Sequence, residues 1–426
     1  MSIFYRQRPA LVWKYFEEIC RIPRTSRNEE KIRKYLLDFA SEKNLESKED
    51  KAGNILIIRP ASPGMEKVKS LVLQSHMDMV GEKETGLRHD WLRDPVIPFV
   101  RNGWVSAKGT TLGADDGIGI AAQLAVLSDK RLRTGKIEAL FTVDEETGMT
   151  GANNLNPEFF ESRTLLNLDS EDEGIIYIGC AGGIETSATI SYIPQRLIAD
   201  DSICLGLSIS GLHGGHSGDE IHKGYGNAIK LISRLVRSVQ SICKIKLASI
   251  EGGNLRNAIP REAKAVIVAG KQDYERISNI VDDYRRLLVK EIGTVEKEFV
   301  ISVTNESLPE FVPDNKTCSR VLEAIDCLPH GVIDWSKEMD DLVETSSNLA
   351  SVRFSENNRI NIVTTQRSSL ETGKKKAAEM AAECLRKAGA EVKHSQSYPG
   401  WQPNLSSEIL SIAKLSYRRL FGKEPL

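Results

Sequence analysis

The chain has 426 residues, of which 40% are hydrophobic and 27% are charged, and its formal net charge is −2. This length predicts two or three domains, and the ordinary composition excludes an intrinsically disordered chain and a membrane protein. There is no long basic run and no apolar stretch of the roughly 18 residues that span a bilayer. Neither nucleic acid nor a membrane is therefore expected as a partner.

The N-terminal segment has no continuous apolar core, so it does not resemble a secretory signal peptide, and a cytoplasmic location is expected. The seven cysteines are scattered, and none has the Cys-x-x-Cys spacing that is typical of thiolate zinc sites. Reduced thiols are the simplest interpretation. The cysteines are Cys20, Cys180, Cys204, Cys243, Cys318, Cys327 and Cys384.

Helices and strands alternate in the first part of the chain. Apolar residues at three- and four-residue spacing predict two helices, and Asn28 is expected to cap the second. Short apolar runs that end in polar residues predict strands. The predicted helices cover 13–22, 29–42 and 117–129, and the predicted strands cover 54–60, 70–78, 138–146 and 164–172. This alternation predicts an α/β domain with a mostly parallel, buried sheet in residues 1–185.

The pattern changes at about residue 186, where polar and apolar residues begin to alternate as in antiparallel strands. The predicted strands cover 185–193, 202–211, 263–270 and 299–306, and the predicted helices cover 225–240 and 275–293. Strands with two long helices on one side predict an inserted α+β domain in residues 186–385. A last helix at 406–422 is expected to return to the first domain, so 386–426 is assigned to it.

Residues with metal-binding chemistry follow the predicted strands of the first domain. In open α/β sheets, ligands bind beyond the carboxyl ends of the strands. Carboxylates that converge there would repel one another without cations, so we expect two divalent ions, zinc first, with manganese or cobalt as alternatives. The residues at strand ends and in the glycine-rich turn 113–119 are His76, Asp78, Asp115, Asp116, Glu145, Glu146 and Asp169.

Each of these features also has an ordinary structural explanation. His76 would serve as a core histidine, and the pair Asp115–Asp116 would cap the helix that starts near Gly119. The pair Glu145–Glu146 would be a solvated strand end. The turn resembles a dinucleotide-binding turn, but its carboxylates would repel phosphates and the G-x-G-x-x-G spacing is absent. Only the joint occurrence of these features favours a metal site.

The motifs SHMDMV, GADDGIG, FTVDEETGMTGA and NLDSED resemble those of the M20 family of metallopeptidases. The longer segments KGTTLGADDGIGIA, GCAGG and GLHGGHSGDEIH are similar to the cytosolic aminoacyl-histidine (Xaa-His) dipeptidases, the PepD type of this family. The likeness covers nearly the whole chain. It implies a zinc-peptidase-like catalytic domain with an inserted lid domain, homodimers formed through that lid, and small peptides as substrates.

The resemblance implies a role for each residue of the acidic group. His76 and Asp169 bind one metal ion, Glu146 binds the other, and Asp115 bridges both. Asp78 orients His76 without binding metal. The peptide bond that follows Asp115 is cis in the family.

The resemblance further implies how dipeptides are hydrolysed. Glu145, as general base, takes a proton from a water that bridges the two ions and passes it to the leaving amine. A histidine of the lid stabilises the oxyanion, and His216 is the candidate, with His213 as the alternative. Asn257 and Arg353 are candidates for holding the substrate carboxylate.

Members of the family continue with a segment that carries a last metal-binding histidine. No residue here matches it, since His394 lies too early in the chain. We therefore expect residues 386–426 to be a truncated return to the catalytic domain, with weak or absent activity if the molecule ends there. An aminotripeptidase or N-acyl amino acid amidohydrolase of the same family, and a non-catalytic dimeric scaffold, are the alternatives.

Overall fold

The computed structural model describes residues 3–198, 201–355, 357–395 and 397–426. The chain divides into two compact units. The first unit comprises Met1–Ile176 and Ile412–Leu426, and the second comprises Tyr177–Ser411. The sequence pattern predicts boundaries at 185/186 and 385/386 instead. The second unit is longer at its end because β18 (Glu391–His394) adds a strand to its sheet.

The first unit contains a five-stranded sheet in the order β1-β2-β6-β3-β7. Strands β6, β3 and β7 are parallel, as expected, whereas β1 and β2 join antiparallel at one edge. The parallel strands end together, which brings the residues that follow them to one edge. The strands are β1 (Glu46–Glu49), β2 (Ile55–Arg59), β3 (Leu71–His76), β6 (Ile137–Thr142) and β7 (Leu165–Asn167).

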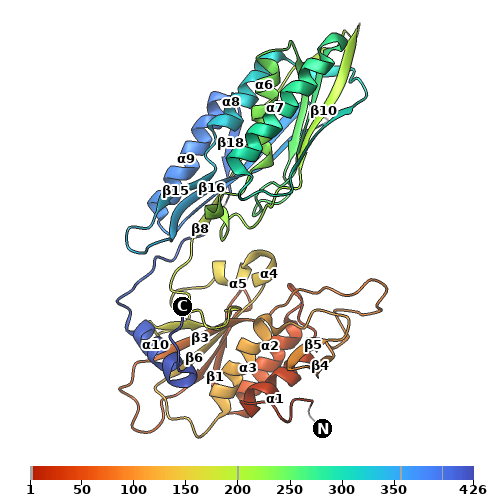
Figure 1. Ribbon diagram of the computed structural model, residues 1–426. Coiled ribbons are helices and arrows are strands. Elements are labelled where there is room, and N and C mark those ends of the chain that lie inside the picture. The colour runs from red at the N-terminus through yellow and green to blue at the C-terminus, as the bar shows by residue number, and fades with distance from the viewer. Residues whose placement is uncertain (1–2, 199–200, 356, 396) are drawn as a thin grey trace. The chain divides into compact units, whose positions relative to one another are not determined.

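Helices α1, α2 and α3 pack with this sheet around one apolar core (Figure 1). Every residue of β6 is buried, which explains its continuous apolar run. Buried side chains from each layer form the core, among them Phe16, Leu36, Ile57, Leu124 and Phe141. The other elements of this unit are α1 (Ala10–Cys20), α2 (Glu30–Glu42), β4 (Pro98–Arg101), β5 (Trp104–Ala107), α3 (Ala114–Ser128), α4 (Glu145–Gly148), α5 (Thr150–Asn153) and most of α10 (Glu408–Phe421).

The predicted cap of α2 is wrong. The N-cap residue is Glu29, and no side chain caps this helix. The amide of Asn28 instead donates to the Thr25 hydroxyl and to the Ser26 carbonyl, so it is used within the preceding turn.

The second unit contains a nine-stranded sheet in which all paired strands are antiparallel. Helices α6, α7, α8 and α9 lie together along one face of it (Figure 1). The helices are α6 (Ala228–Gln240), α7 (Tyr274–Ile292), α8 (Asn315–Cys327) and α9 (Glu371–Lys387). Besides β18, the strands of this unit are β8 (Gly182–Ser191), β9 (Pro194–Arg196), β10 (Ser202–Ser210), β11 (Lys246–Gly252), β12 (Ala263–Gly270), β13 (Val300–Asn305), β14 (Phe311–Pro313), β15 (Gly331–Trp335), β16 (Val343–Ser355) and β17 (Arg359–Ser368).

The prediction that all cysteines are reduced is wrong for one pair. Cys327, at the end of α8, forms a disulfide with Cys384 of α9. The two helices pack against each other, so their Cα atoms lie 5.7 Å apart although 57 residues separate them in the chain. Cysteine spacing carries no information about such a pairing between distant segments.

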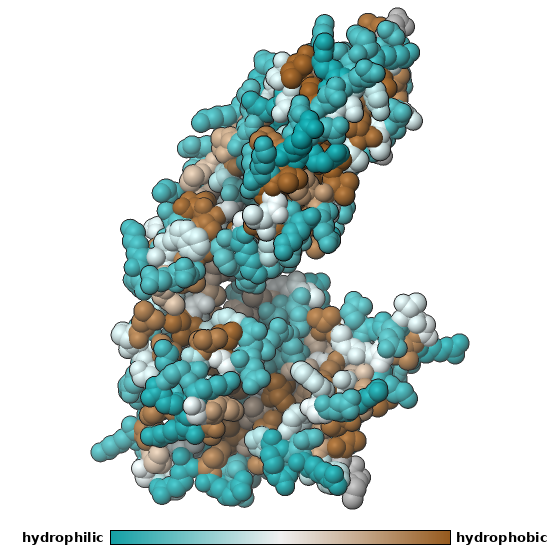
Figure 2. Space-filling model, in the orientation of Figure 1, coloured by the Kyte–Doolittle hydropathy of each residue, from teal (hydrophilic) through white to brown (hydrophobic). Residues whose placement is uncertain are grey.

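The face of the molecule seen in Figure 2 is mostly polar. Figure 2 shows charged and polar side chains over most of the visible face, with apolar side chains scattered between them. Within the described ranges, no helix combines the length and the apolar character that crossing a bilayer requires.

Candidate metal centre and active site

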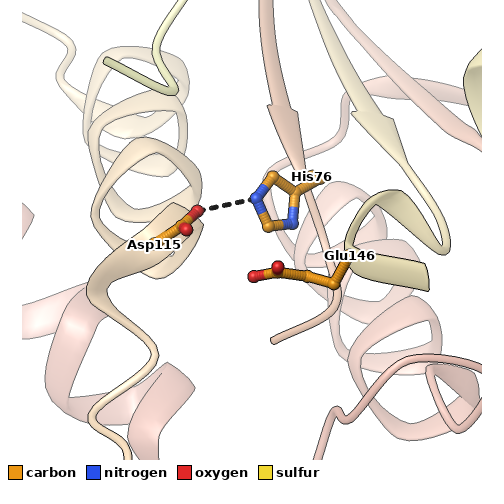
Figure 3. Close-up of side chains that lie close together, drawn as sticks. All are labelled: His76, Asp115 and Glu146. Atoms are coloured by element: carbon orange, nitrogen blue, oxygen red, sulfur yellow. Dashed lines mark hydrogen bonds and ion pairs between the residues drawn. The ribbon is translucent and has the colours of Figure 1, made fainter. Parts of the chain in front are cut away.

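The side chain of His76 lies between two carboxylates. His76 is the last residue of β3 and is buried, and its Nε2 lies 2.8 Å from Asp115 Oδ1 and 3.4 Å from Asp169 Oδ1. Single ligand atoms of His76, Asp115 and Glu146 all lie within 4.8 Å of one another. These three side chains come from a strand end, a turn before a helix and a short helix, and they point toward one another (Figure 3).

The two aspartates of the glycine-rich turn have different surroundings. The peptide bond between Asp115 and Asp116 is cis, and both residues lie outside helical geometry. Asp115 is exposed and faces His76. Asp116 is buried, and its Oδ1 accepts the N–H of Gly119 at 3.1 Å, as an N-cap does. The capping explanation therefore holds for Asp116, while Asp115 is free to act as a ligand.

Four consecutive backbone amides hold the turn that carries the glutamate pair, and each donates to a side chain from another part of the chain. The N–H of Val143 donates to Asn54 Oδ1 and that of Asp144 to Glu29 Oε1. The next two, from Glu145 and Glu146, donate to the carboxylate of Asp78. Asp144 has the left-handed backbone conformation, so the chain turns there, as the two glutamates require.

Asp78 lies beneath both His76 and the glutamate pair. Its Oδ1 is 3.3 Å from His76 Nδ1, and its Oδ2 also accepts the hydroxyl of Ser26 at 2.8 Å. Burial opposes the ionised carboxylate, but these partners and the amides of Glu145 and Glu146 outweigh it and lower the pKa of Asp78 to about 2. Asp78 therefore stays ionised at neutral pH.

The charges of the site act strongly on His76. Burial lowers the pKa of this imidazole, but its contacts with Asp169, Asp78 and Asp115 outweigh burial and raise the pKa to about 11. Without a metal ion, the carboxylates therefore hold a proton on the imidazole.

Burial also acts on the acids themselves. It raises the pKa of Glu146 to about 7, with a further contribution from Asp115. Burial likewise raises the pKa of Glu145, and Asp169 adds to that shift. Burial and then Asp169 raise the pKa of Asp116 to about 8. So many acids with raised pKa values at one point indicate a site whose negative charge exceeds the positive charge beside it.

The donor set fits divalent metal ions. Zinc forms bonds of about 2.0–2.2 Å to nitrogen and oxygen, so two atoms that bind the same ion lie roughly 3–3.5 Å apart. The distances from His76 Nε2 to Asp115 Oδ1 (2.8 Å) and to Asp169 Oδ1 (3.4 Å) are close to this range. One imidazole nitrogen with carboxylates from Asp115, Glu146 and Asp169 also matches the ligand types that zinc, manganese and cobalt accept. The positive charge of the ions would offset the crowded acids.

Two of the predicted lid residues are neighbours in the second unit. His216 pairs with Ala258 in an isolated β-bridge, and the N–H of Ser217 donates to the carbonyl of Asn257 at 2.8 Å. The Nδ1 of His216 lies 2.9 Å from Asp219 Oδ2, and the imidazole is 38% exposed. His213, the alternative, stacks on Tyr225 with ring centroids 4.1 Å apart. The ring of His213 is the more exposed of the two, while His216 has two contacts with Asp219 at its Nδ1.

The structure does not bring Arg353 to this cluster. Arg353 is exposed on β16, and among the described residues its guanidinium donates to the carbonyl of Gly253 at 3.4 Å. In the β16–β17 ladder it pairs with Asn361, whereas Arg367 pairs with Ser346, seven residues away, or about 20 Å along the strand.

Arg367 lies instead beside the His216 segment. A Cβ atom added to Gly218 would lie 3.4 Å from the guanidinium carbon of Arg367. Nη1 of Arg367 donates to the hydroxyl of Tyr398 at 3.2 Å, while its buried Nε has no hydrogen-bond partner among the described residues. A water molecule or a substrate group would satisfy this buried donor.

Sequence reasoning missed the side chains that support the site, which include Arg24, Ser26, Glu29, Asn54 and Arg367. They lie in loops or on polar strands and follow no metal-binding motif. The one signal in the sequence is Asn54, an amide side chain directly before a run of apolar residues.

Comparisons with known proteins place this chain among peptidases. The family described as Peptidase family M20/M25/M40 matches residues 72–426. The cytosol non-specific dipeptidase of Escherichia coli (strain K12) is 39% identical over 428 residues, which cover 100% of this chain and 87% of that protein. The crystal structure of aminoacylhistidine dipeptidase from Vibrio alginolyticus is 38% identical, with a TM-score of 0.91, over 100% of this chain and 87% of that one. Aminopeptidase PepT from Bacillus cereus, 17% identical, shares the fold with a TM-score of 0.54 over 98% of this chain and 83% of that one.

Proposed function

Because this chain belongs to the M20/M25/M40 peptidase family, whose members are metal-dependent enzymes, we propose that it hydrolyses dipeptides at a centre of two divalent ions. The observation that carries this proposal is the convergence of His76, Asp115 and Glu146 within 4.8 Å, with Asp169 beside His76. In this proposal His76 and Asp169 would hold one ion, Glu146 would hold the other, and Asp115 would contribute to both. Zinc is the first candidate.

Bound ions would lower the pKa of a water molecule and polarise the scissile carbonyl. Glu145 is the proposed general base: it takes the proton of the attacking water and delivers it to the leaving amine. Its raised pKa suits both steps, because a carboxylate with a pKa nearer neutrality can accept and then release a proton. The backbone N–H of Glu145 donates to Asp78, and this hydrogen bond holds Glu145 next to the proposed ligand Glu146.

We assign the recognition of the substrate to the second unit. His216 would donate to the carbonyl oxygen on which charge develops. Asn257 and an arginine would hold the terminal carboxylate. The unpartnered Nε of Arg367 beside the His216 segment favours Arg367 over Arg353 for this arginine.

Dipeptides with a C-terminal histidine are the proposed preferred substrates, in line with the relative from Vibrio alginolyticus. The E. coli relative is named a non-specific dipeptidase, so the preference need not be strict. Its name also supports a cytoplasmic location for this protein. The exposed edge strand β13 of the nine-stranded sheet supports homodimers formed through the second unit.

The test combines metal content with turnover of a substrate panel of Xaa-His and other dipeptides, tripeptides and N-acyl amino acids. We expect two metal equivalents per chain, and hydrolysis of dipeptides that a chelator abolishes. Glu145→Gln should keep both equivalents and lose about 10²–10⁴-fold in kcat, whereas the exposed control Glu171→Gln should behave like the unmodified protein. Full activity without metal, or activity on N-acyl amino acids alone, would overturn the proposal.

A further inference from the structure

Arg24 is a buried cation that contacts the backbone on two sides of the proposed metal centre. It lies in the loop between α1 and α2 and is 2% exposed. Its Nη1 donates to the carbonyls of Met77 at 3.0 Å and Asp78 at 2.7 Å, and its Nη2 donates to the carbonyl of Gly113. One planar guanidinium thus joins the end of β3 to the glycine-rich turn.

Two glycines leave room for this guanidinium. A Cβ atom on Gly113 would lie 2.8 Å from Nη2 of Arg24, and one on Gly117 would lie 2.6 Å from the same nitrogen. Both distances are shorter than a Cβ atom can approach without displacing its neighbour. Gly117 therefore leaves the space that Arg24 occupies. Gly113, whose φ is +66° and whose added Cβ would also lie 2.6 Å from Met79 Sδ, leaves space for both side chains.

The guanidinium of Arg24 donates to backbone carbonyls, and among the described residues no carboxylate contacts it directly. Burial lowers the pKa of this guanidinium, while Cys20, Asp116 and Asp78 oppose the shift. A buried cation is costly unless nearby negative charge compensates it. The acids of the centre supply that charge, so the cation and the acidic site depend on each other.

We infer that Arg24 is a positioning residue for the metal centre, an inference that rests on the proposed function. The carbonyls that it binds belong to the two residues that follow His76 and to Gly113, two residues before Asp115. By fixing both segments, Arg24 sets the separation between the His76 nitrogen and the Asp115 carboxylate. A lysine would keep the charge but lacks the planar fork that reaches three carbonyls at once.

The experiment compares metal binding by the unmodified full-length protein with that of variants, after metal is removed with a chelator. Zinc affinity is measured by calorimetry, and the visible spectrum of bound cobalt(II) reports ligand geometry. The variants are Arg24→Lys, Gly117→Ala, their combination, and the control Leu36→Ala. Leu36 is fully buried in the same core but lies in α2, away from the site. Circular dichroism establishes that each variant is folded at the temperature used.

We expect Arg24→Lys to bind zinc at least about tenfold more weakly and to alter the cobalt spectrum. Gly117→Ala should do the same, and should add little in the Arg24→Lys background, because it acts by displacing Arg24. Leu36→Ala should lower the melting temperature but leave affinity and spectrum unchanged.

Unchanged affinity and spectrum in Arg24→Lys would overturn the inference and leave the proposed function standing. If that variant does not fold, Gly117→Ala decides in the same way. A failure of the unmodified protein to bind any metal would overturn both together.

Discussion

The carboxylate of Asp78 accepts the backbone N–H of Glu145 at 3.0 Å, although 67 residues separate the two in the chain. Its other oxygen accepts the N–H of Glu146 at 3.2 Å, and Oδ1 also lies 3.3 Å from His76 Nδ1. Asp78 therefore does more than orient an imidazole. It connects His76, at the end of β3, to the proposed base Glu145 and the proposed ligand Glu146, which follow β6.

Asp78→Asn should impair catalysis about 10- to 100-fold, the usual effect of losing a partner that orients metal ligands. The amide side chain has one acceptor, so at least one of the two glutamate N–H groups would face a donor. Steady-state kinetics with a dipeptide measures this effect. Ser26→Ala is the control, because it removes one hydroxyl from Asp78 and leaves the amides untouched. Equal losses in both variants would contradict the assigned role.

Glu29→Ala should lower both activity and stability, because it leaves the buried N–H of Asp144 without a partner. An unsatisfied buried donor costs about 1–3 kcal/mol. Glu29→Gln should be milder, since its amide oxygen can still accept that N–H. Glu30→Ala, at the exposed neighbouring position, is the control and should change neither property. Urea unfolding measures the effect on stability, and steady-state kinetics measures kcat. If Glu29→Ala changes neither quantity, this contact does not matter for stability or catalysis.

Metal binding should release protons and strengthen as the pH rises. In the metal-free protein the pKa of His76 is raised to about 11, so a metal ion must displace its proton at pH 7. The pKa of Glu146 is raised to about 7, so metal binding releases a second proton, from this carboxyl group, below pH 7 and almost none from it above pH 7. Linkage then predicts an affinity that increases about 10- to 100-fold per pH unit between about pH 6 and 8. Calorimetry in buffers of different ionisation enthalpy counts these protons, and a pH-independent affinity would contradict the prediction.

Arg367→Ala should raise the KM for dipeptides with a free carboxyl terminus at least about tenfold, since a charged hydrogen bond contributes about 1.5–3 kcal/mol. The matched control is Arg353→Ala on the neighbouring strand, which should leave KM unchanged because that side chain is exposed and distant along the sheet. For substrates with an amidated C-terminus, the KM values of the Arg367→Ala variant and the unmodified protein should be similar. If Arg353→Ala has the larger effect, the original assignment from the sequence is the better one.

Reduction of the Cys327–Cys384 disulfide should destabilise the second unit. A bond that closes a separation of 57 residues contributes about 4 kcal/mol in the chain-entropy model. For a unit of this size, that corresponds to a decrease of roughly 10 °C in melting temperature. Scanning calorimetry with and without a thiol reductant measures it. The double variant Cys327→Ser/Cys384→Ser should melt at the reduced temperature in both conditions; a reductant effect in that variant would assign the shift to another cause.

The sequence predicted the strands that carry the site because their ends combine two strong local signals, a fully apolar run and polar residues directly after it. Strands β16 and β17 were not predicted. Their buried faces carry polar side chains such as Asn348, Thr364 and Gln366, so hydrophobic periodicity is weak there.

The supporting side chains could not be predicted for a different reason. Glu29 binds an amide 115 residues away, and Asn54 binds one 89 residues away. Such contacts depend on how segments fold together and leave no periodic trace in the local sequence. The proposed ligands, by contrast, belong to short motifs whose residue types already specify their chemistry.

The division into two units separates two kinds of requirement. The proposed ligands, the proposed base and the side chains that hold them belong to the first unit, formed by Met1–Ile176 and Ile412–Leu426. His216, Asn257 and Arg367 belong to the other. Substitutions beside Asn257 and Arg367 should therefore change which peptide side chain is favoured, while the proposed ligands and the proposed base in the first unit stay the same. Engineering of selectivity should begin in the second unit.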